Sequence, residues 1–326
     1  MNILLTGGAG YIGSHVALNL LDNGHKVTII DSLVTGTKKL VPAKSDYFKC
    51  DISDIEKINE ILKKNKFDLV MHFAGLTKVD ESVLNPEKYH VNNFEKSKIF
   101  FNLCFKNNIK KVIFSSTAGV YGNSGSTYKK ETDELNPINP YAKSKYEIEK
   151  FLIENSKNQN LQYIILRYFN VAGADELKRS GLISKSSSNL IKVVCEAAAK
   201  KREKIIINGD NYKTKDGTAI RDFIHVSDIA EIHSLAASFI FKNSISDIYN
   251  CGYGAGYSVK EVITEMENII NSKLKVEIGP RRAKDIPISV ANSEKFKKKF
   301  NWKPKFNNLN YTLKTALDWE KSINEL

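Results

Sequence analysis

The chain has 326 residues, 42% of them hydrophobic, so it is long enough for one large domain or two closely associated ones. Its net charge is +12, but the lysines are dispersed and no run interleaves basic with aromatic residues, which argues against nucleic-acid binding. No apolar run reaches the roughly 18 residues of a membrane span, so we expect no membrane-spanning helix. The N-terminus enters a strand directly, so we expect no signal peptide, and the four cysteines lack the spacing of metal ligands. We therefore expect a cytoplasmic protein that binds no metal ion.

The first predicted elements form a strand–turn–helix unit with glycines at the turn. Residues 2–6 are predicted to be a short buried strand, and residues 11–22 an amphipathic helix. Gly7, Gly10 and Gly13 lie at three-residue spacing around the turn. Glycine tolerates unusual backbone angles and lets a phosphate approach the main chain, where the first N–H groups of the helix face the anion. The unit therefore predicts a pyrophosphate site.

A second apolar strand, over residues 26–30, ends at Asp31. This acid lies about twenty residues beyond the glycine turn, the usual position of a ribose-binding carboxylate. A carboxylate there accepts hydrogen bonds from both ribose hydroxyls of NAD and repels the extra phosphate of NADP. Glycine turns end many strands, so the motif becomes specific only with Asp31. The two features together predict an NAD site.

Strands and helices continue to alternate through the first half of the chain. Further strands are predicted at 47–50, 69–73, 111–116 and 162–167, and helices at 54–64, 86–107 and 140–155, with Ser53 or Asp54 as the cap of the first of these helices. Such alternation implies a parallel sheet with helices on both faces, and ligands of such sheets bind at the carboxyl ends of the strands. We therefore expect the motifs at these ends to share one site.

After residue 170 the alternation loosens into a polar, serine-rich loop over 173–189. Beyond the loop we predict helices at 190–201, 227–241, 259–271 and 309–323, and a short strand at 205–207. Ser258 is the expected cap of the third of these helices. The sequence shows no internal repeat and no low-complexity linker. The second half is therefore expected to be a smaller domain that packs on the first.

A tyrosine and a lysine mark the start of the helix predicted over 140–155. Tyr141 and Lys145 are four residues apart, which places both on one helical face. A lysine ammonium beside a phenol favours the phenolate and lowers its pKa, so Tyr141 is a candidate base near neutral pH. Thr117, at the end of the fifth strand, offers a hydroxyl at the same sheet edge. Many helices carry such a pair, but the combination with Thr117 and the glycine turn is much more specific.

These motifs resemble the extended short-chain dehydrogenase/reductase family, over nearly the full chain, and within it the branch that inverts C4 of UDP-hexoses. The resemblance is carried by residues 6–13, 73–76, 114–118, 141–145, 167–170, 216–226 and 280–287. It implies an α/β protein with a doubly wound parallel sheet, the Rossmann fold, in an NAD-binding domain at 1–170. A smaller C-terminal α/β domain at 171–326 is expected to bind the UDP-sugar. Some segments of this second half are expected to return to the first domain.

The resemblance also implies three groups of site residues. Tyr141 and Lys145 carry catalysis, and Thr117 polarises the sugar hydroxyl. The implied NAD contacts are Gly7, Gly10, Tyr11, Ile12, Gly13, Asp31, Asp51, Ile52, Phe73, Ala74, Gly75, Asn92 and Phe169. The implied UDP-sugar contacts are Asn170, Asn189, Arg221, Arg282, Asp285 and Ser289.

The implied reaction is an NAD-dependent inversion at C4 of UDP-glucose and UDP-galactose through a transient 4-keto sugar. Family members confined to unmodified hexoses usually carry a tyrosine at the position of Ser289, so a serine is expected to admit the N-acetylated pair as well. In the family, the helices that correspond to 86–107 and 140–155 pair with their copies, which implies a homodimer. The chain departs from the family pattern at Thr77, where a lysine is usual, and in a shortened 174–188 loop.

Three other functions can be weighed against these residues. A 4,6-dehydratase needs an Asp–Glu pair after the threonine of the fifth strand, where this chain has Ala118 and Gly119. A UDP-glucuronate epimerase or decarboxylase is a closer alternative, because it also needs tyrosine, lysine and NAD. A non-catalytic dinucleotide sensor would need the glycine turn but has no use for Tyr141 and Lys145.

Overall fold

The computed structural model describes residues 1–123, 126–184, 187–282 and 285–323, and these fall into two compact units. The first unit comprises Met1–Gly122, Leu135–Arg167 and Ala230–Tyr249. The second comprises Asn123–Glu134, Tyr168–Ile229 and Asn250–Leu326. Each unit is therefore assembled from separate stretches of the chain.

The first unit is built around a seven-stranded sheet. Its strands, in spatial order, are β12 (Asp247–Cys251), β7 (Gln162–Tyr168), β5 (Lys111–Thr117), β4 (Leu69–His72), β1 (Asn2–Thr6), β2 (Lys26–Asp31) and β3 (Asp46–Lys49). The pairs β1–β2, β2–β3, β1–β4 and β4–β5 are parallel. The strand order reverses between β1 and β4, which is the point where ligands bind in doubly wound sheets. The predicted fold class is confirmed.

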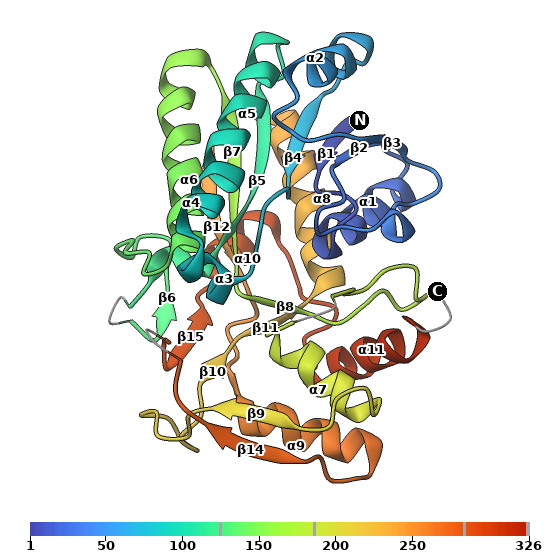
Figure 1. The fold of residues 1–326 in the computed structure, drawn as a ribbon. Helices are drawn as coiled ribbons and strands as arrows, with labels where there is room; N and C mark the ends of the chain where they lie inside the picture. Colours follow the sequence, from blue (N-terminus) through green and yellow to red (C-terminus); the bar gives the residue numbers. More distant parts are fainter. Residues whose placement is uncertain (124–125, 185–186, 283–284, 324–326) are drawn as a thin grey trace. The chain divides into compact units, whose positions relative to one another are not determined.

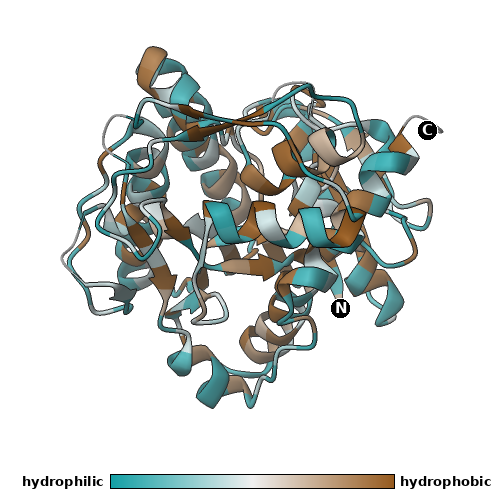
Figure 2. Ribbon diagram, turned by 90° about the horizontal axis from the view of Figure 1, so that it is seen from below, coloured by the Kyte–Doolittle hydropathy of each residue, from teal (hydrophilic) through white to brown (hydrophobic). Residues whose placement is uncertain are grey.

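Helices cover both faces of this sheet (Figure 1). One face carries α2 (Ile55–Lys64), α5 (Lys96–Lys106) and α6 (Pro140–Gln159), and the other carries α1 (Tyr11–Asp22) and α8 (Val226–Lys242). Buried side chains such as Phe100, Phe114 and Leu152 fill the space under the first group. Figure 2 shows the resulting pattern, with apolar residues along the strands and along parts of each helix. Burial of these faces is the main force that holds the layers together.

The helix predicted over 86–107 exists, but it is not a regular α-helix. It consists of α4 (Pro86–Tyr89), a π-helical segment labelled η2 (His90–Glu95) and α5. Asn93 lies in the π segment and is buried, and its side chain bonds both backbone groups of Leu76, with the Leu76 N–H donating at 2.8 Å and the carbonyl accepting at 3.0 Å. Wide turns of this kind occur frequently at functional sites.

The second unit contains three small sheets. Four strands pair in the order β13 (Tyr257–Ser258), β10 (Ile220–Arg221), β15 (Ile288–Ala291) and β6 (Tyr128–Lys129). Two further pairs join β11 (Phe223–His225) to β8 (Asn170–Ala172), and β14 (Val276–Gly279) to β9 (Ile205–Asn208). The predicted strand at 205–207 corresponds to β9. The other strands of this unit were not predicted, because segments of two to four residues carry too little periodic pattern.

Three helices pack together in the second unit: α7 (Leu190–Ala198), α9 (Val259–Ile270) and α11 (Leu309–Ser322). Val194, Met266 and Leu313 are among the buried residues between them. Ser258 caps α9 as predicted, in a capping box with Glu261. The helix predicted over 190–201 ends earlier, at Ala198, because Lys200 takes a left-handed conformation (φ 60°) and ends the helical turn. Among the described residues, no helix combines the length and apolar character of a membrane span.

Candidate active site

The glycine turn after β1 is closely packed against the loop after β4. Gly7 has a left-handed backbone (φ 72°), and a Cβ there would lie 2.5 Å from the Ala74 nitrogen. A Cβ on Gly13 would lie 2.3 Å from the Gly7 carbonyl oxygen. Gly10 caps α1 and provides no side-chain acceptor for the first turn of the helix. The turn therefore requires glycine at 7 and 13, and the start of α1 is built from main-chain donors.

Asp31 ends β2 and is tied to the glycine turn. Its carboxylate accepts hydrogen bonds from the Ala9 N–H at 3.0 Å and from the Leu33 N–H at 2.8 Å. Desolvation raises the pKa of Asp31, and these two hydrogen bonds act in the opposite direction. A carboxylate fixed by backbone donors keeps further lone pairs for a ligand hydroxyl. Such an acceptor suits the ribose of a dinucleotide.

Asp51 and Ile52 follow the end of β3. Asp51 accepts hydrogen bonds from the Ser53 N–H at 2.9 Å and from the Lys96 ammonium at 2.6 Å. Desolvation alone would raise the pKa of Asp51, but these contacts hold it below its usual value. The side chain of Ile52 is buried. This pair therefore offers an ionised carboxylate beside an apolar side chain.

Asn93 is a site residue that the sequence analysis missed. Besides holding Leu76, its amide donates to Ser144 of α6 at 3.2 Å, and Asn92 donates to its carbonyl oxygen at 3.1 Å. It thereby links the loop that contains Phe73, Ala74 and Gly75 to α6. The sequence did contain a signal for this role, because asparagine is unfavourable inside a helix and Asn93 lies in the middle of one.

The three predicted catalytic residues are brought together at the carboxyl end of β5. Asn139 caps α6 by accepting from the Ala142 N–H at 2.8 Å, which sets the first turn where Tyr141 lies. The phenol of Tyr141 is hydrogen-bonded to the Thr117 side chain. Lys145 is buried, and its ammonium donates to the Ser115 carbonyl at 3.0 Å. One helix and one strand thus position all three side chains.

The direction of the Tyr141 pKa differs from the sequence prediction. Desolvation raises the pKa of this phenol, and the hydrogen bond from Thr117 offsets only part of that rise. Desolvation also lowers the pKa of Lys145 to about 8. The ammonium is directed to the Ser115 carbonyl, so it does not outweigh the loss of water around the phenol. The prediction that Lys145 lowers the pKa of Tyr141 is therefore wrong for this arrangement.

A buried ion pair lies behind the catalytic residues. Arg167 of β7 donates to Glu149 of α6 through Nε at 3.0 Å and Nη2 at 2.6 Å, and to the Tyr121 hydroxyl at 2.9 Å. The hydroxyl of Ser116, next to Thr117, also donates to Glu149. Desolvation would lower the pKa of Arg167, but the Glu149 carboxylate raises it instead. This network fixes α6 against β5, and the sequence analysis assigned no role to Arg167.

In the second unit, a cationic cluster forms around Asp285. Arg221 donates to Asp285 at 2.6 Å, and the Tyr212 hydroxyl donates to the other carboxylate oxygen at 3.0 Å. The Arg281 guanidinium lies 3.9 Å above the Tyr212 ring. The structure therefore joins two predicted substrate residues, Arg221 and Asp285, to two that were missed. Tyr212 carries no local motif, and Arg281 lies in the 280–287 motif but was given no role, since only the fold shows that it packs on the Tyr212 ring.

The remaining predicted residues of this unit are spread over several elements. Ser289 of β15 lies opposite Arg221 of β10 and is half-buried, whereas Arg282 is exposed. Asn189 caps α7, and its side-chain oxygen accepts from the Lys192 N–H at 3.3 Å. Phe169 is buried, and its N–H donates to Cys251, while Asn170 begins β8. In the described part of the chain, His, Cys, Asp and Glu side chains form no group of three or more suited to a metal ion.

Comparison with known proteins gives consistent matches over the whole length. Residues 3–252 match the model of the NAD dependent epimerase/dehydratase family. The UDP-glucose 4-epimerase of Azospirillum brasilense is 40% identical over 323 residues, covering 99% of this chain and 93% of that protein. The solved UDP-glucose 4-epimerase of Stenotrophomonas maltophila, with bound NAD and formylated UDP-arabinopyranose, has a TM-score of 0.96 at 32% identity, covering 100% of this chain and 99% of that one.

One similar structure differs in the substrates it is named for. The UDP-Glc/GlcNAc 4-epimerase of Campylobacter jejuni has a TM-score of 0.86 and is 41% identical, covering 98% of this chain and 99% of that one. The similar proteins thus include epimerases named for plain and for N-acetylated sugars.

Proposed function

The chain belongs to the NAD dependent epimerase/dehydratase family, and we propose that it is a 4-epimerase that interconverts UDP-glucose and UDP-galactose. The observation that carries the proposal is the meeting of Tyr141, Lys145 and Thr117 at the end of β5. Lys145 is buried one helical turn from Tyr141, and burial of a charged lysine is costly. A non-catalytic dinucleotide sensor would have no use for this arrangement.

The first unit fits NAD as its cofactor. The glycine turn leaves no room for a Cβ at Gly7 or Gly13, and Asp31 offers a backbone-anchored carboxylate for the ribose hydroxyls. We assign the pyrophosphate to the turn and the start of α1, and the adenine to Asp51 and Ile52. NAD held there would supply the acceptor and donor of the C4 hydride.

The chain's own residues move the proton. Tyr141 accepts the proton of the sugar 4-hydroxyl and later gives it back, while Thr117 holds the phenol in place. Lys145 has a pKa of about 8, so it is mostly protonated at neutral pH. Desolvation raises the pKa of Tyr141, and the hydrogen bond with Thr117, which favours the phenolate, offsets part of that rise.

We assign the UDP-sugar to the second unit. A guanidinium fork matches diphosphate oxygens in geometry and charge, which suits Arg221 and Arg282. Asp285 holds Arg221 in one orientation through the 2.6 Å bond, so the fork is ordered before a ligand arrives. Asn170 and Asn189 add polar groups that can donate to or accept from the nucleotide.

Conversion of UDP-glucose by the purified protein, without added cofactor, tests the proposed function. We expect UDP-galactose to form and NAD to be released on denaturation at near one molecule per chain. UDP-glucuronate supplied in parallel should stay unchanged. Conversion of UDP-glucuronate alone would favour an epimerase or decarboxylase of that sugar, and NADP in place of NAD would contradict the role of Asp31.

Ser289 is expected to broaden the substrate range to the N-acetylated pair. A half-buried serine leaves space that a phenol ring would fill, and the backbone of Ser289 is fixed by the bond of its carbonyl to the Asp222 N–H at 3.1 Å. Wild type should therefore turn over both sugar pairs, and Ser289→Tyr should lose the N-acetylated pair while keeping the plain hexoses. The measurement is kcat/KM for both pairs.

Ser289→Ala is the matched control for that variant, because it removes the hydroxyl without adding bulk, and it should retain both activities. A wild type that ignores the N-acetylated sugars would rule out the broad range. Unchanged turnover of these sugars by Ser289→Tyr would show that this position does not border the acetamido group.

We further propose a homodimer. Val83 and Leu84 of α3 (Val79–Leu84) are 61% and 80% exposed, and Val91 of η2 is also exposed, close in sequence to α5. Apolar groups of this kind on a surface often mark an interface, and twofold dimers are the commonest oligomers. Light scattering at micromolar concentration should give twice the chain mass of 36.7 kDa. A mass of one chain would contradict the dimer.

We also propose a cytoplasmic location. Cys50, Cys104, Cys195 and Cys251 are all buried free thiols. Unpaired thiols are typical of reducing compartments, whereas oxidising ones favour disulfides. Fractionation of the cells that make the protein would test the location.

A further inference from the structure

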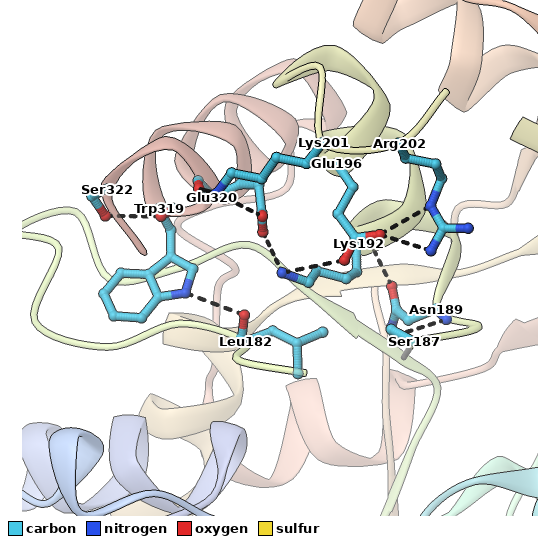
Figure 3. Close-up of polar contacts among 10 residues, drawn as sticks. All are labelled: Leu182, Ser187, Asn189, Lys192, Glu196, Lys201, Arg202, Trp319, Glu320 and Ser322. Atoms are coloured by element: carbon cyan, nitrogen blue, oxygen red, sulfur yellow. Dashed lines mark hydrogen bonds and ion pairs between the residues drawn. The ribbon is translucent and has the colours of Figure 1, made fainter. Parts of the chain in front are cut away.

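Two consecutive residues of the C-terminal helix contact the segment that leads to Asn189. Trp319 and Glu320 of α11 are each only 3% exposed. Figure 3 shows both side chains and their polar contacts. Trp319 contacts the loop that precedes Asn189, and Glu320 contacts the first turn of α7, which Asn189 caps. Neighbouring side chains of one helix thus contact Leu182 and the helical turn that Asn189 caps.

Lys192 connects Glu320 to Asn189. Its backbone N–H donates to the Asn189 side-chain oxygen at 3.3 Å, and its ammonium donates to the Glu320 carboxylate. Lys192 is 7% exposed, so its charge needs a partner. Glu320 also accepts from Lys201 at 3.1 Å, which fixes the carboxylate from its other side. The position of the α7 cap is therefore coupled to Glu320.

Glu196 does not replace Glu320 in this role. It lies 3.6 Å from the Lys192 ammonium, too far for a hydrogen bond. Its carboxylate instead accepts two hydrogen bonds from Arg202, at 2.9 Å and 2.8 Å. Figure 3 shows Lys192 between the two carboxylates, with Arg202 on the far side of Glu196.

Trp319 holds the loop upstream of Asn189. Its indole N–H donates to the Leu182 carbonyl at 3.3 Å. Gly181 lies against the indole ring, and a Cβ there would come within 2.4 Å of ring atoms. This close contact requires glycine and fixes the backbone where the loop crosses α11.

We propose that Trp319 and Glu320 are positioning residues of the nucleotide-sugar site and act through Asn189. The α7 cap uses the carbonyl oxygen of the Asn189 amide, which leaves the amide N–H groups as donors for a ligand oxygen. A shift of the cap would misdirect these donors without altering Tyr141 or Lys145. The inference rests on the proposed function, in which Asn189 contacts the UDP-sugar.

Glu320→Gln tests the inference on the protein purified with its own cofactor. We expect the Kd for UDP and the KM for UDP-glucose to rise roughly tenfold, the effect of one misdirected hydrogen bond. The value of kcat and the NAD content should stay near wild type. Asp318→Asn is the matched control, because it removes the same charge from an exposed position of the same helix, and it should change nothing.

A double-mutant cycle with Asn189→Ala separates positioning from general destabilisation. If Glu320 acts through Asn189, adding Glu320→Gln to Asn189→Ala should weaken UDP binding little further. Trp319→Phe keeps an aromatic ring and removes the N–H, so the same cycle can be run with it if Glu320→Gln does not fold. Additive losses, or wild-type UDP affinity in both single variants, would overturn the inference. A wild type that does not bind UDP would overturn the proposed function instead.

Discussion

Tyr141→Phe is expected to lower kcat for UDP-glucose by roughly 10²–10⁴-fold, the usual contribution of a positioned acid–base group. The substitution removes only the phenol oxygen, which is bonded to Thr117 and which we propose to exchange its proton with the sugar 4-hydroxyl. The ring remains, so α6 keeps its first turn and its Asn139 cap. The UDP affinity and the NAD content should therefore stay near wild type. Steady-state rates and a titration with UDP are the measurements.

Tyr146→Phe is the matched control for this prediction. Tyr146 lies on the same helix, is half-buried and carries Lys150 over its ring at 4.9 Å. Loss of its hydroxyl should leave kcat unchanged. A wild-type rate in Tyr141→Phe would show that another group moves the proton. Equal losses in both variants would point to damage of α6 and not to proton transfer.

Arg167→Met is expected to lower the free energy of unfolding by about 3–5 kcal/mol, the cost of breaking a buried ion pair. Arg167 and Glu149 are 2% and 1% exposed, so the variant leaves the Glu149 carboxylate buried without its cation. It also removes a donor to the Tyr121 hydroxyl. Urea unfolding of wild type and variant measures the difference.

Arg202→Met provides the comparison for Arg167→Met. Arg202 also forms two hydrogen bonds to one glutamate, Glu196, but it is 36% exposed, so its loss should cost at most about 1 kcal/mol. Replacing Glu149 by Gln together with Arg167→Met should recover part of the stability, because no unpaired charge is then buried. An effect of Arg167→Met no larger than that of Arg202→Met would contradict the importance of this network.

Six strands of the seven-stranded sheet follow from the sequence because their signals are local and long, whereas β12 was not predicted. Apolar strands alternate with amphipathic helices over residues 2–167, which predicts the doubly wound sheet. The turn at Gly7 and Gly13 is recognisable because only glycine tolerates its conformation and close contacts. The Asn139 cap and Pro140 likewise mark the start of α6.

Features that depend on tertiary contacts could not be predicted in this way. The strands of the second unit are short, and the contacts of Tyr212 with Asp285 and with the Arg281 guanidinium form only in the folded chain. The pKa of Tyr141 depends on how far the surroundings remove water from the phenol, which residue spacing does not reveal. The π-helical turn at Asn93 likewise depends on its bonds to Leu76.

The fate of the C4 hydrogen tests the proposed epimerisation most directly. UDP-glucose carrying deuterium at C4 is incubated with the purified protein without added cofactor, and the product is analysed by NMR. We expect UDP-galactose that retains the deuterium at C4, because the hydrogen leaves and returns within one site. UDP-galactose with solvent hydrogen at C4, or the absence of any UDP-galactose, would contradict the proposed function.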